Sequence, residues 1–259
     1  MKIATWNVNS LAVRLPQLLD WLKTHSPDLV TLQETKLTDD KFPLMELQAA
    51  GYAHCAVFGQ KTYNGVAIAS RHPLGDVVRN ITGFADEQSR LLTATVDSPA
   101  GRLRVVNGYF VNGQAPGTDK FDYKMSWLRG LRDHMRTQVG SHERVVLLGD
   151  FNIAPEDRDS FDPVGLRETI HHTSEERDHF RKSIELGLVD SFRLFDQPEK
   201  SFSWWDYRML GYQKNRGLRI DHILVSDGMK ASVKSCAVDR TPRKWKQPSD
   251  HAPVTVELL

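Results

Sequence analysis

Four short polar clusters, each at the end of an apolar run, constrain this chain more than any other feature. They are Trp-Asn-Val-Asn at residues 6–9, Gln-Glu-Thr at 33–35, Gly-Asp-Phe-Asn at 149–152 and Ser-Asp-His-Ala-Pro at 249–253. The ends of buried strands are where α/β folds expose their ligand sites. We therefore expect the fold to bring these clusters to one site.

The side chains in these clusters indicate a hard-cation site beside an acid/base pair. They supply Asn, Glu, Asp and His, but no thiol. Oxygen ligands favour Mg²⁺ or Mn²⁺ over zinc, and an Asp-His pair suits proton transfer or anion stabilisation. The combination predicts a metal-dependent phosphodiesterase.

Length and composition are those of an ordinary globular protein. A chain of 259 residues, 40% hydrophobic and 26% charged, can bury a large core. No apolar run reaches the length of a membrane span, and Asn7 and Asn9 interrupt the first run too early for a signal peptide. Cys55 and Cys236 are too few for a disulfide framework or a zinc site. We expect a cytoplasmic protein without membrane association.

The net charge of +1 gives no overall attraction to nucleic acid, but the charge is unevenly distributed. Residues 208–246 carry ten lysines and arginines against three aspartates. Such a basic sector fits a face that binds a polyanion. An ordinary solvated Lys/Arg surface is the alternative.

The two halves of the chain repeat one order of predicted elements: strand, helix, strand. The segments are residues 2–8, 11–22 and 29–32 in the first half, and residues 103–109, 125–139 and 145–148 in the second. Each half therefore delivers one carboxylate at the end of its second strand, Glu34 in the first and Asp150 in the second.

Further strands and one further helix complete a single domain over residues 1–259. Strand patterns occupy residues 65–70, 91–97, 220–225, 233–238 and 254–258, and a capped helix with Phe180 and Ile184 inward occupies 174–186. No flexible linker divides the chain. We predict two packed β-sheets with helices outside, an α/β sandwich.

Each cluster also has an ordinary structural explanation. Asp150 is the strongest candidate, because Gly149 permits close backbone approach and Asn152 lies on the same side of an extended chain; the alternative is an Asx-turn that ends the strand. Glu34 alone could be a surface residue, and residues 249–253 could be a turn before an edge strand. The occurrence of all four clusters at strand ends favours a site.

A serine nucleophile is a second chemical hypothesis, with Ser249 beside His251. Neighbouring residues in an extended segment point apart, and the Gly-x-Ser-x-Gly turn of serine hydrolases is absent. The sequence therefore argues against it.

The same segments resemble a known family. The chain is similar, nearly end to end, to the exonuclease III family of DNA-repair nucleases within the endonuclease/exonuclease/phosphatase superfamily. The similarity also covers residues 107–109, 204–208 and 215–221. The final Asp-His is shared by the superfamily, whereas the segments at 204–208 and 215–221 are specific to its DNA-repair branch. The resemblance implies a four-layer sandwich of two packed mixed β-sheets flanked by helices.

The resemblance also implies a metal site and its ligands. Glu34 resembles the principal Mg²⁺ ligand, with Mn²⁺ as a substitute ion. Asn7 lies beside it and Asp250 close by, directly or through water. Asp150 and Asn152 complete the implied metal set.

Catalytic roles follow from the same resemblance. Asp150 resembles the residue that orients or deprotonates the attacking water, and Asn152 and Tyr109 resemble groups that hold the scissile phosphate. His251, oriented by Asp221, resembles the group that stabilises the charged transition state. The residues leave open whether Asp150 or His251 is the base.

The implied partner is double-stranded DNA with 3′ ends, nicks or lesions, bound by a monomer. The residues implied as DNA contacts are Lys36, Asn112, Trp204, Arg208, Lys214, Arg216, Leu218 and Ile220. Aromatic and aliphatic groups among cations fit a distorted duplex. Because tryptophans also pack cores, we expect one of Trp204 and Trp205 to be buried.

One departure from the family pattern concerns substrate choice. Where strong abasic-site cleavers carry a small residue facing the sugar pocket, this chain has His171, followed by His172. An imidazole there would narrow the pocket for a flipped abasic sugar and favour trimming of 3′ ends, as exonuclease or 3′-phosphatase, over internal incision. The alternative is that both histidines point to solvent.

We therefore predict a Mg²⁺-dependent DNA-repair nuclease that acts at 3′ ends and, subject to His171, 5′ to abasic sites. One rival is a superfamily phosphatase acting on a small phosphoester. Another is a catalytically silent DNA-binding module, although such a module would not need the full set of acidic and histidine residues.

Overall fold

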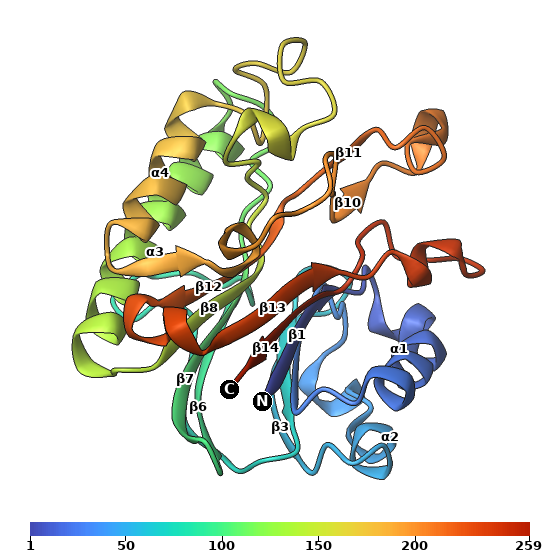
Figure 1. Ribbon diagram of the computed structural model, residues 1–259, viewed down its shortest axis with the longest axis vertical. Helices are drawn as coiled ribbons and strands as arrows, with labels where there is room; N and C mark the ends of the chain where they lie inside the picture. The colour runs from blue at the N-terminus through green and yellow to red at the C-terminus, as the bar shows by residue number, and fades with distance from the viewer.

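Two six-stranded β-sheets packed face to face form the centre of the computed structural model, which describes all 259 residues (Figure 1). The strands are β1 (Lys2–Asn7), β2 (Leu29–Gln33), β3 (His54–Phe58), β4 (Val66–Ser70), β5 (Leu74–Arg79), β6 (Leu91–Ser98), β7 (Gly101–Tyr109), β8 (Val145–Asp150), β9 (Leu188–Asp190), β10 (Trp204–Trp205), β11 (Gly217–Leu218), β12 (Asp221–Ser226), β13 (Val233–Val238) and β14 (Val254–Leu258). The first sheet has the order β13-β14-β1-β2-β4-β3 and the second β5-β6-β7-β8-β12-β9, while β10 and β11 form a separate ribbon.

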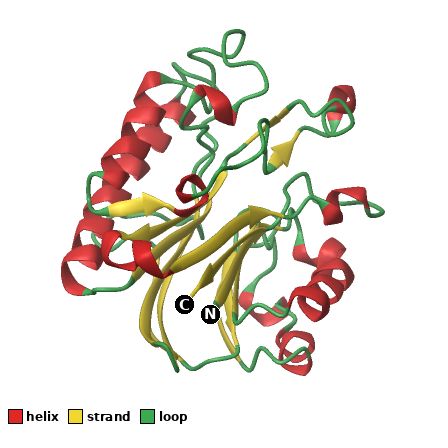
Figure 2. Cartoon of the chain, viewed as in Figure 1, coloured by secondary structure: helices red, strands yellow, loops and turns green.

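Helices cover the outer faces of both sheets (Figure 2). The helices are α1 (Leu11–His25), α2 (Leu44–Ala49), α3 (Asp119–Ser141) and α4 (Ser174–Ile184). The first two pack on the first sheet, and α3 and α4 on the second (Figure 1). The predicted four-layer α/β sandwich is thereby confirmed. None of the helices combines the length and apolar character needed to cross a membrane.

Three apolar cores hold these layers together. The core between the sheets includes Ile3, Leu29, Val105 and Val146, all without exposed surface. Separate cores lie between the first sheet and α1, and between the second sheet and α3 with α4. Burial of large aliphatic side chains of this kind stabilises a fold by roughly 1.5–3 kcal/mol each.

The predicted repeat of strand, helix and strand is present in both sheets. In the first, β1 and β2 pair in parallel across α1; in the second, β7 and β8 pair in parallel across α3. An antiparallel strand flanks each pair on either side, β14 and β4 in one sheet and β6 and β12 in the other. The two halves therefore share one local topology, which places Glu34 and Asp150 at corresponding strand ends.

Several short or peripheral elements are absent from the sequence-based prediction. The strands β3 and β5 are sheet edges with half-exposed side chains, and β5 has an irregular register between Gly75 and Val78. The remaining unpredicted elements, β9, β10, β11 and α2, span six residues or fewer. Short edge elements lack the apolar periodicity on which the prediction depends.

Candidate active site

Strand register places predicted residues side by side at one end of the sandwich. Tyr109 pairs with Asp150 across β7 and β8, and Asp150 pairs with Asp221 across β8 and β12. In the other sheet, Asn7 ends β1 and Glu34 follows β2. The Asn7 Nδ2 donates to Glu34 Oε1 at 3.0 Å and to Asp150 Oδ2 at 2.9 Å, joining the two sheets at this end.

These strand ends surround a cavity of about 140 Å³, which we call the catalytic cavity. It is lined by Glu34, Tyr109, Asn112, Asp150, Asn152, His171, Trp204, Ile220, Asp250 and His251. All ten are residues for which the sequence predicted a functional role. Asn7 and Asp221 are buried outside this lining and contact two of its residues, Asp150 and His251 respectively.

Unusual backbone conformations aim several of these side chains. Gly149 has φ +135°, and a Cβ there would lie 2.0 Å from the Gly108 carbonyl oxygen, so the close strand approach requires glycine as expected. Glu34, Asn152 and His171 adopt left-handed φ values of 52°, 51° and 70°. L-residues rarely occupy this region unless surrounding contacts hold them there, and such strain is concentrated at functional sites.

Asp150 is buried among hydrogen-bond donors. Its Oδ1 accepts from the Asn152 backbone N–H at 2.9 Å and its Oδ2 from Asn7. Burial raises the pKa of Asp150 to about 7, against the opposing charge of His251. A carboxyl group with such a pKa can accept a proton near neutral pH.

His251 lies between two carboxylates. Its Nδ1 contacts the Asp221 oxygens at 2.9 and 3.0 Å, and its Nε2 lies 3.6 Å from Asp150 Oδ2. Burial alone would lower the pKa of His251, but the carboxylates of Asp221 and Asp150 outweigh it and raise this pKa to about 10. Ser203 Oγ donates to Asp221 Oδ2 at 2.6 Å and holds that carboxylate in place. The arrangement fixes a charged imidazole with Nε2 at the cavity.

The donor set of the cavity fits a hard divalent cation. One donor atom from each of Glu34, Asp150 and His251 lies within 4.8 Å of the others. Two carboxylates with an amide nearby are ligands of the kind Mg²⁺ and Mn²⁺ prefer. As oriented, Asn7 presents its amide nitrogen to both carboxylates, and a half-turn of the amide would present Oδ1 to a cation instead.

Asp250 lines the same cavity but stands apart from this tight group. Its Oδ1 accepts from Asn9 Nδ2 and its Oδ2 from Trp204 Nε1, both at 2.9 Å. Lys36 forms an ion pair with Glu34 Oε2 at 2.9 Å instead of extending to solvent. Through Asn9 and Trp204, Asp250 connects the segment after β1 with the tryptophan-bearing segment.

A second pocket of about 800 Å³ adjoins the catalytic cavity, with Asn112, His171 and Trp204 in both walls. Among the predicted DNA contacts, the second pocket also contains Arg208, Arg216 and Leu218, and Arg216 lies over the Phe161 ring at 4.9 Å. Lys214 lines neither pocket. As expected, one tryptophan of the pair is buried: Trp205 has no exposed surface, while Trp204 is half-buried.

Both histidines of the segment that departs from the family pattern are buried, with exposed fractions of 8% for His171 and 3% for His172. The alternative that they point to solvent is wrong. His171 Nδ1 lies 2.7 Å from the Asn152 carbonyl oxygen, so Nδ1 carries the proton and Nε2 is bare. Burial, with the nearby Lys124 ammonium, lowers the pKa of His171 to about 3, which keeps the ring neutral. His172 contacts Ser160 Oγ through Nε2 at 2.9 Å.

Two arginines of the predicted basic sector do not belong to a surface. Arg219 is buried and pairs with Asp159 at 2.7 Å and Asp190 at 2.8 Å. Arg243 is buried and donates to the Ser249 carbonyl. Both side chains donate to internal acceptors, so the exposed part of the basic sector is smaller than the sequence suggested.

The structure also contradicts the serine-nucleophile hypothesis, because Ser249 is buried and already bonded to internal partners. Ser249 has no exposed surface, donates from Oγ to the Asn7 carbonyl at 2.7 Å and accepts from the His251 backbone N–H at 3.1 Å. It shapes the turn that presents His251.

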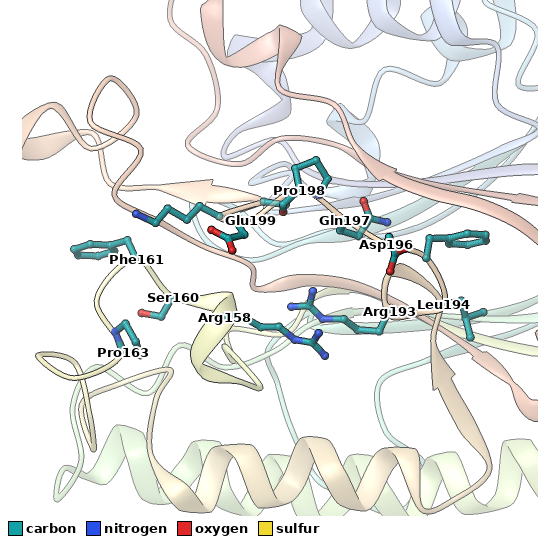
Figure 3. A pocket seen from close by; sticks show the side chains of 13 residues that line it. Arg158, Ser160, Phe161, Pro163, Arg193, Leu194, Asp196, Gln197, Pro198 and Glu199 are labelled. Atoms are coloured by element: carbon teal, nitrogen blue, oxygen red, sulfur yellow. The ribbon is translucent and has the colours of Figure 1, made fainter.

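A larger cavity of about 1010 Å³ lies outside this site and contains none of the predicted residues (Figure 3). The Arg158 and Arg193 guanidinium groups point toward one another across it (Figure 3). Each is already paired with a carboxylate, Arg158 with Glu156 and Arg193 with Asp159. Size alone therefore does not identify the active site.

Sequence reasoning missed three supporting residues: Ser203, Lys124 and Glu176. Glu176 had a signal, because Thr173 three positions earlier completes a capping box that the structure contains. Lys124 looks like any helical lysine, and Ser203 meets Asp221 only through folding.

Known proteins resemble this chain in sequence and in fold. A model of the Endonuclease/Exonuclease/phosphatase family matches residues 4–251. Exodeoxyribonuclease III of Haemophilus influenzae is 34% identical, with 100% of each chain covered. The 3′ phosphatase NExo from Neisseria, bound to product DNA hairpin, is 48% identical with a TM-score of 0.96, over 100% of this chain and 99% of NExo. An AP endonuclease from Archaeoglobus fulgidus is 34% identical with a TM-score of 0.94, over the same shares.

Proposed function

We propose that this chain trims damaged or blocked 3′ termini of DNA, since it belongs to the Endonuclease/Exonuclease/phosphatase family and, within it, to the exonuclease III family of DNA-repair nucleases. It is accordingly a phosphoric ester hydrolase of the exonuclease III type that acts at 3′ ends. The proposal concerns the balance of activities: hydrolysis of 3′-phosphates and removal of 3′-terminal nucleotides dominate, and incision at internal abasic sites is slow.

The observation that carries this proposal is the position of His171. Its ring lines the catalytic cavity, is anchored on Asn152 and lies 6.5 Å from the Trp204 ring, centre to centre. An internal abasic nucleotide must be extruded within a continuous backbone and would compete with this ring for space. A 3′ terminus approaches with greater freedom. The similar fold of an AP endonuclease supports a side-chain origin for the restriction, because the backbone alone does not forbid incision.

A substrate panel on one duplex scaffold tests the proposal: abasic site, 3′-phosphate, recessed 3′-hydroxyl and intact nick. A loss of ~3 kcal/mol of transition-state stabilisation would slow abasic incision by about a hundredfold relative to 3′ ends. His171→Gly or His171→Ser should raise abasic incision selectively, whereas His142→Ser, at the distant end of α3, should change neither rate. Equal wild-type rates on abasic sites and 3′ ends, or a ratio unaltered by His171→Gly, would contradict the proposal.

We propose Mg²⁺, with Mn²⁺ as a substitute, as the metal cofactor. Glu34 would be its principal ligand, with Asn7, Asp250, Asp150 and Asn152 around it. When bound, the ion would offset negative charge on the scissile phosphate and the leaving oxygen. The donor chemistry of the cavity supports this choice, because it combines carboxylates and amides without a thiolate.

Within this site, Asp150 would orient the attacking water and accept its proton. The charged His251, held by Asp221, would donate from Nε2 to a phosphate oxygen as negative charge develops there. Tyr109 and Asn152 would hold the phosphate. Burial, together with the Glu34 and Asp150 carboxylates, raises the pKa of Tyr109. The phenol therefore stays protonated and would donate a hydrogen bond to the phosphate.

For the DNA itself, we propose that Trp204, Arg208, Arg216 and Leu218 contact the duplex from the second pocket, and Asn112 and Ile220 from the catalytic cavity. Lys214 and Lys36 would act as flanking phosphate contacts. A pocket with indole, guanidinium and aliphatic walls supports a distorted duplex over a small phosphoester. A monomeric protein in the cytoplasm completes the proposal; sedimentation with and without a duplex would test the monomer.

A further inference from the structure

A buried ion pair lies beneath the catalytic cavity, between the two helices that cover the second sheet. Lys124 on α3 contacts Glu176 on α4, and neither side chain has any exposed surface. Burying two charges is costly, and a well-packed apolar pair at such a position is often no less stable. The pair therefore calls for an explanation beyond fold stability.

Lys124 connects two loops of the active site. Its ammonium donates to the carbonyl oxygens of Asn112 at 3.1 Å and Asn152 at 2.8 Å, in addition to Glu176. An ammonium has three donors, so these three acceptors use all of them. Asn112 precedes α3 and Asn152 follows β8, and their side chains meet at 3.3 Å in the cavity wall.

Glu176 connects the third loop to the same point. Its Oε1 accepts from the His171 backbone N–H at 3.1 Å, and its Oε2 accepts from the Thr173 backbone N–H at 3.1 Å and Oγ1 at 2.7 Å. His171 Nδ1 in turn donates to the Asn152 carbonyl oxygen that also accepts from Lys124. Three separate loops are thus held by one pair of charges.

The loops held by this pair need external support. Asn152 and His171 both adopt left-handed backbone conformations, which L-residues keep only when their surroundings hold them there. Lys124 donates to the Asn152 carbonyl oxygen and Glu176 accepts from the His171 backbone N–H, so both hydrogen bonds involve the main chain of these two residues. Without them, both loops could relax toward ordinary conformations and turn their side chains away from the cavity.

We propose that Lys124 and Glu176 are positioning residues that lock Asn112, Asn152 and His171 into one arrangement, and that this lock sets the preference for 3′ ends over internal abasic sites. The inference rests on the proposed function. Neither Lys124 nor Glu176 lines the cavity, so both act through the loops they hold. If the loops become mobile, Asn152 binds the phosphate less well. At the same time the His171 ring no longer blocks the space that an internal abasic sugar would occupy.

The test separates positioning from stability by comparing two substrates. The main variant is the double substitution Lys124→Met with Glu176→Met, which leaves no uncompensated buried charge. Lys120→Met and Glu175→Gln change exposed charges on the same two helices and serve as matched controls. For each protein, kcat and KM are measured on a 3′-phosphate duplex and on an internal abasic duplex, well below the measured Tm.

In the double variant we expect kcat on the 3′-phosphate duplex to fall about tenfold or more, because displacing an active-site group by about 1 Å can slow a reaction by that factor. The ratio of abasic to 3′ activity should rise about tenfold, while KM changes less. The single variant Lys124→Arg, which keeps the positive charge, should have a ratio between those of wild type and the double variant. The two control variants should match wild type. A purely structural role would lower both activities by one common factor.

An unchanged ratio in a folded double variant would overturn the inference. If that variant does not fold, Glu176→Gln decides, because it removes the negative charge but keeps the shape of the side chain and one acceptor oxygen; a wild-type ratio there would equally overturn the inference. Failure of the proposed function has a different signature: a wild-type enzyme inactive on 3′ ends, or equally fast on abasic sites.

Discussion

The two halves of the sandwich repeat one arrangement of strand, helix and strand but place their carboxylates in different surroundings. Glu34, in the first half, keeps 17% of its side chain exposed and pairs with Lys36. Asp150, in the second half, is 1% exposed, with its pKa raised to about 7 by burial. Similar strand ends thus produce one solvent-accessible carboxylate beside a cation and one enclosed carboxylate beside an imidazole.

This difference explains how a repeated fold builds an asymmetric site. An accessible carboxylate suits a metal ion, whereas a buried one with a raised pKa suits proton transfer. Counted along the chain, six histidines of the second half are buried, His134, His171, His172, His179, His222 and His251, and His142 is half-buried, whereas His25, His54 and His72 in the first half are all half-buried. Acid/base chemistry is therefore expected from the second half, and the principal metal ligand, Glu34, from the first.

The largest expected effect comes from emptying the metal site. EDTA should reduce turnover of a 3′-phosphate duplex to the level of a control without enzyme, and added Mg²⁺ or Mn²⁺ should restore it. Glu34→Gln should raise the Mg²⁺ concentration needed for half-maximal rate, because a neutral amide is a weaker ligand for a hard cation. A rate that persists in EDTA, or a Glu34→Gln enzyme with the wild-type Mg²⁺ dependence, would remove the proposed role of the first half.

The next effect concerns the buried carboxylate. Asp150→Asn should lower kcat by about 10²-fold or more, because it removes a proton acceptor while preserving shape. DNA affinity, measured by anisotropy with a labelled duplex, should stay close to wild type. An equal fall in affinity would make Asp150 a structural group and end the division of labour between the halves.

Much of this site was predictable because its residues follow strong, local signals. Asn7, Glu34 and Asp150 each end or follow a largely buried strand, and strand register then brings them together. The ends of these strands can be located in the sequence without knowledge of contacts between distant residues. The resemblance to a known family supplied the roles, including the pairing of His251 with Asp221 that the structure contains.

The parts that were not predictable depend on contacts between distant residues. Arg219 looks like a surface cation, yet it is buried against Asp159, sixty positions earlier in the chain. Lys124 and Glu176 are likewise fifty-two positions apart and give no joint signal in sequence. Charged side chains follow no periodicity when they are buried in pairs, so only the folded arrangement identifies them.

A moderate effect should distinguish the cations of the two halves. Arg216→Ala should weaken DNA binding and lower the slope of log K against log salt by about one unit, because one phosphate contact is lost. Lys36→Ala should lower the slope less, because Lys36, although proposed as a flanking phosphate contact, is paired with Glu34. Titrations of a duplex between low and moderate salt measure both slopes. An unchanged slope in Arg216→Ala would place the second pocket outside the DNA interface.

The last effect leaves turnover aside and concerns stability in mild acid, which we expect to depend on histidines of the second half. His134 is 4% exposed; its Nε2 lies 3.2 Å from Thr93 Oγ1 and its Nδ1 has no partner. Burial, with the Arg104 charge, lowers the pKa of His134 to about 4. Between pH 6.5 and 4 the unfolded chain therefore binds a proton at this residue that the folded chain does not, so the free energy of unfolding falls as pH falls.

The contribution of His134 is up to about 3 kcal/mol across that range. In urea unfolding at successive pH values, His134→Gln should flatten the decline, because the substituted side chain does not titrate. His54→Gln, on the half-buried edge strand of the first half, should leave the wild-type decline in place. If both variants decline alike, His134 does not carry the pH dependence. If His54→Gln gives the flatter curve, acid sensitivity lies in the first half and the contrast between the halves fails at this point.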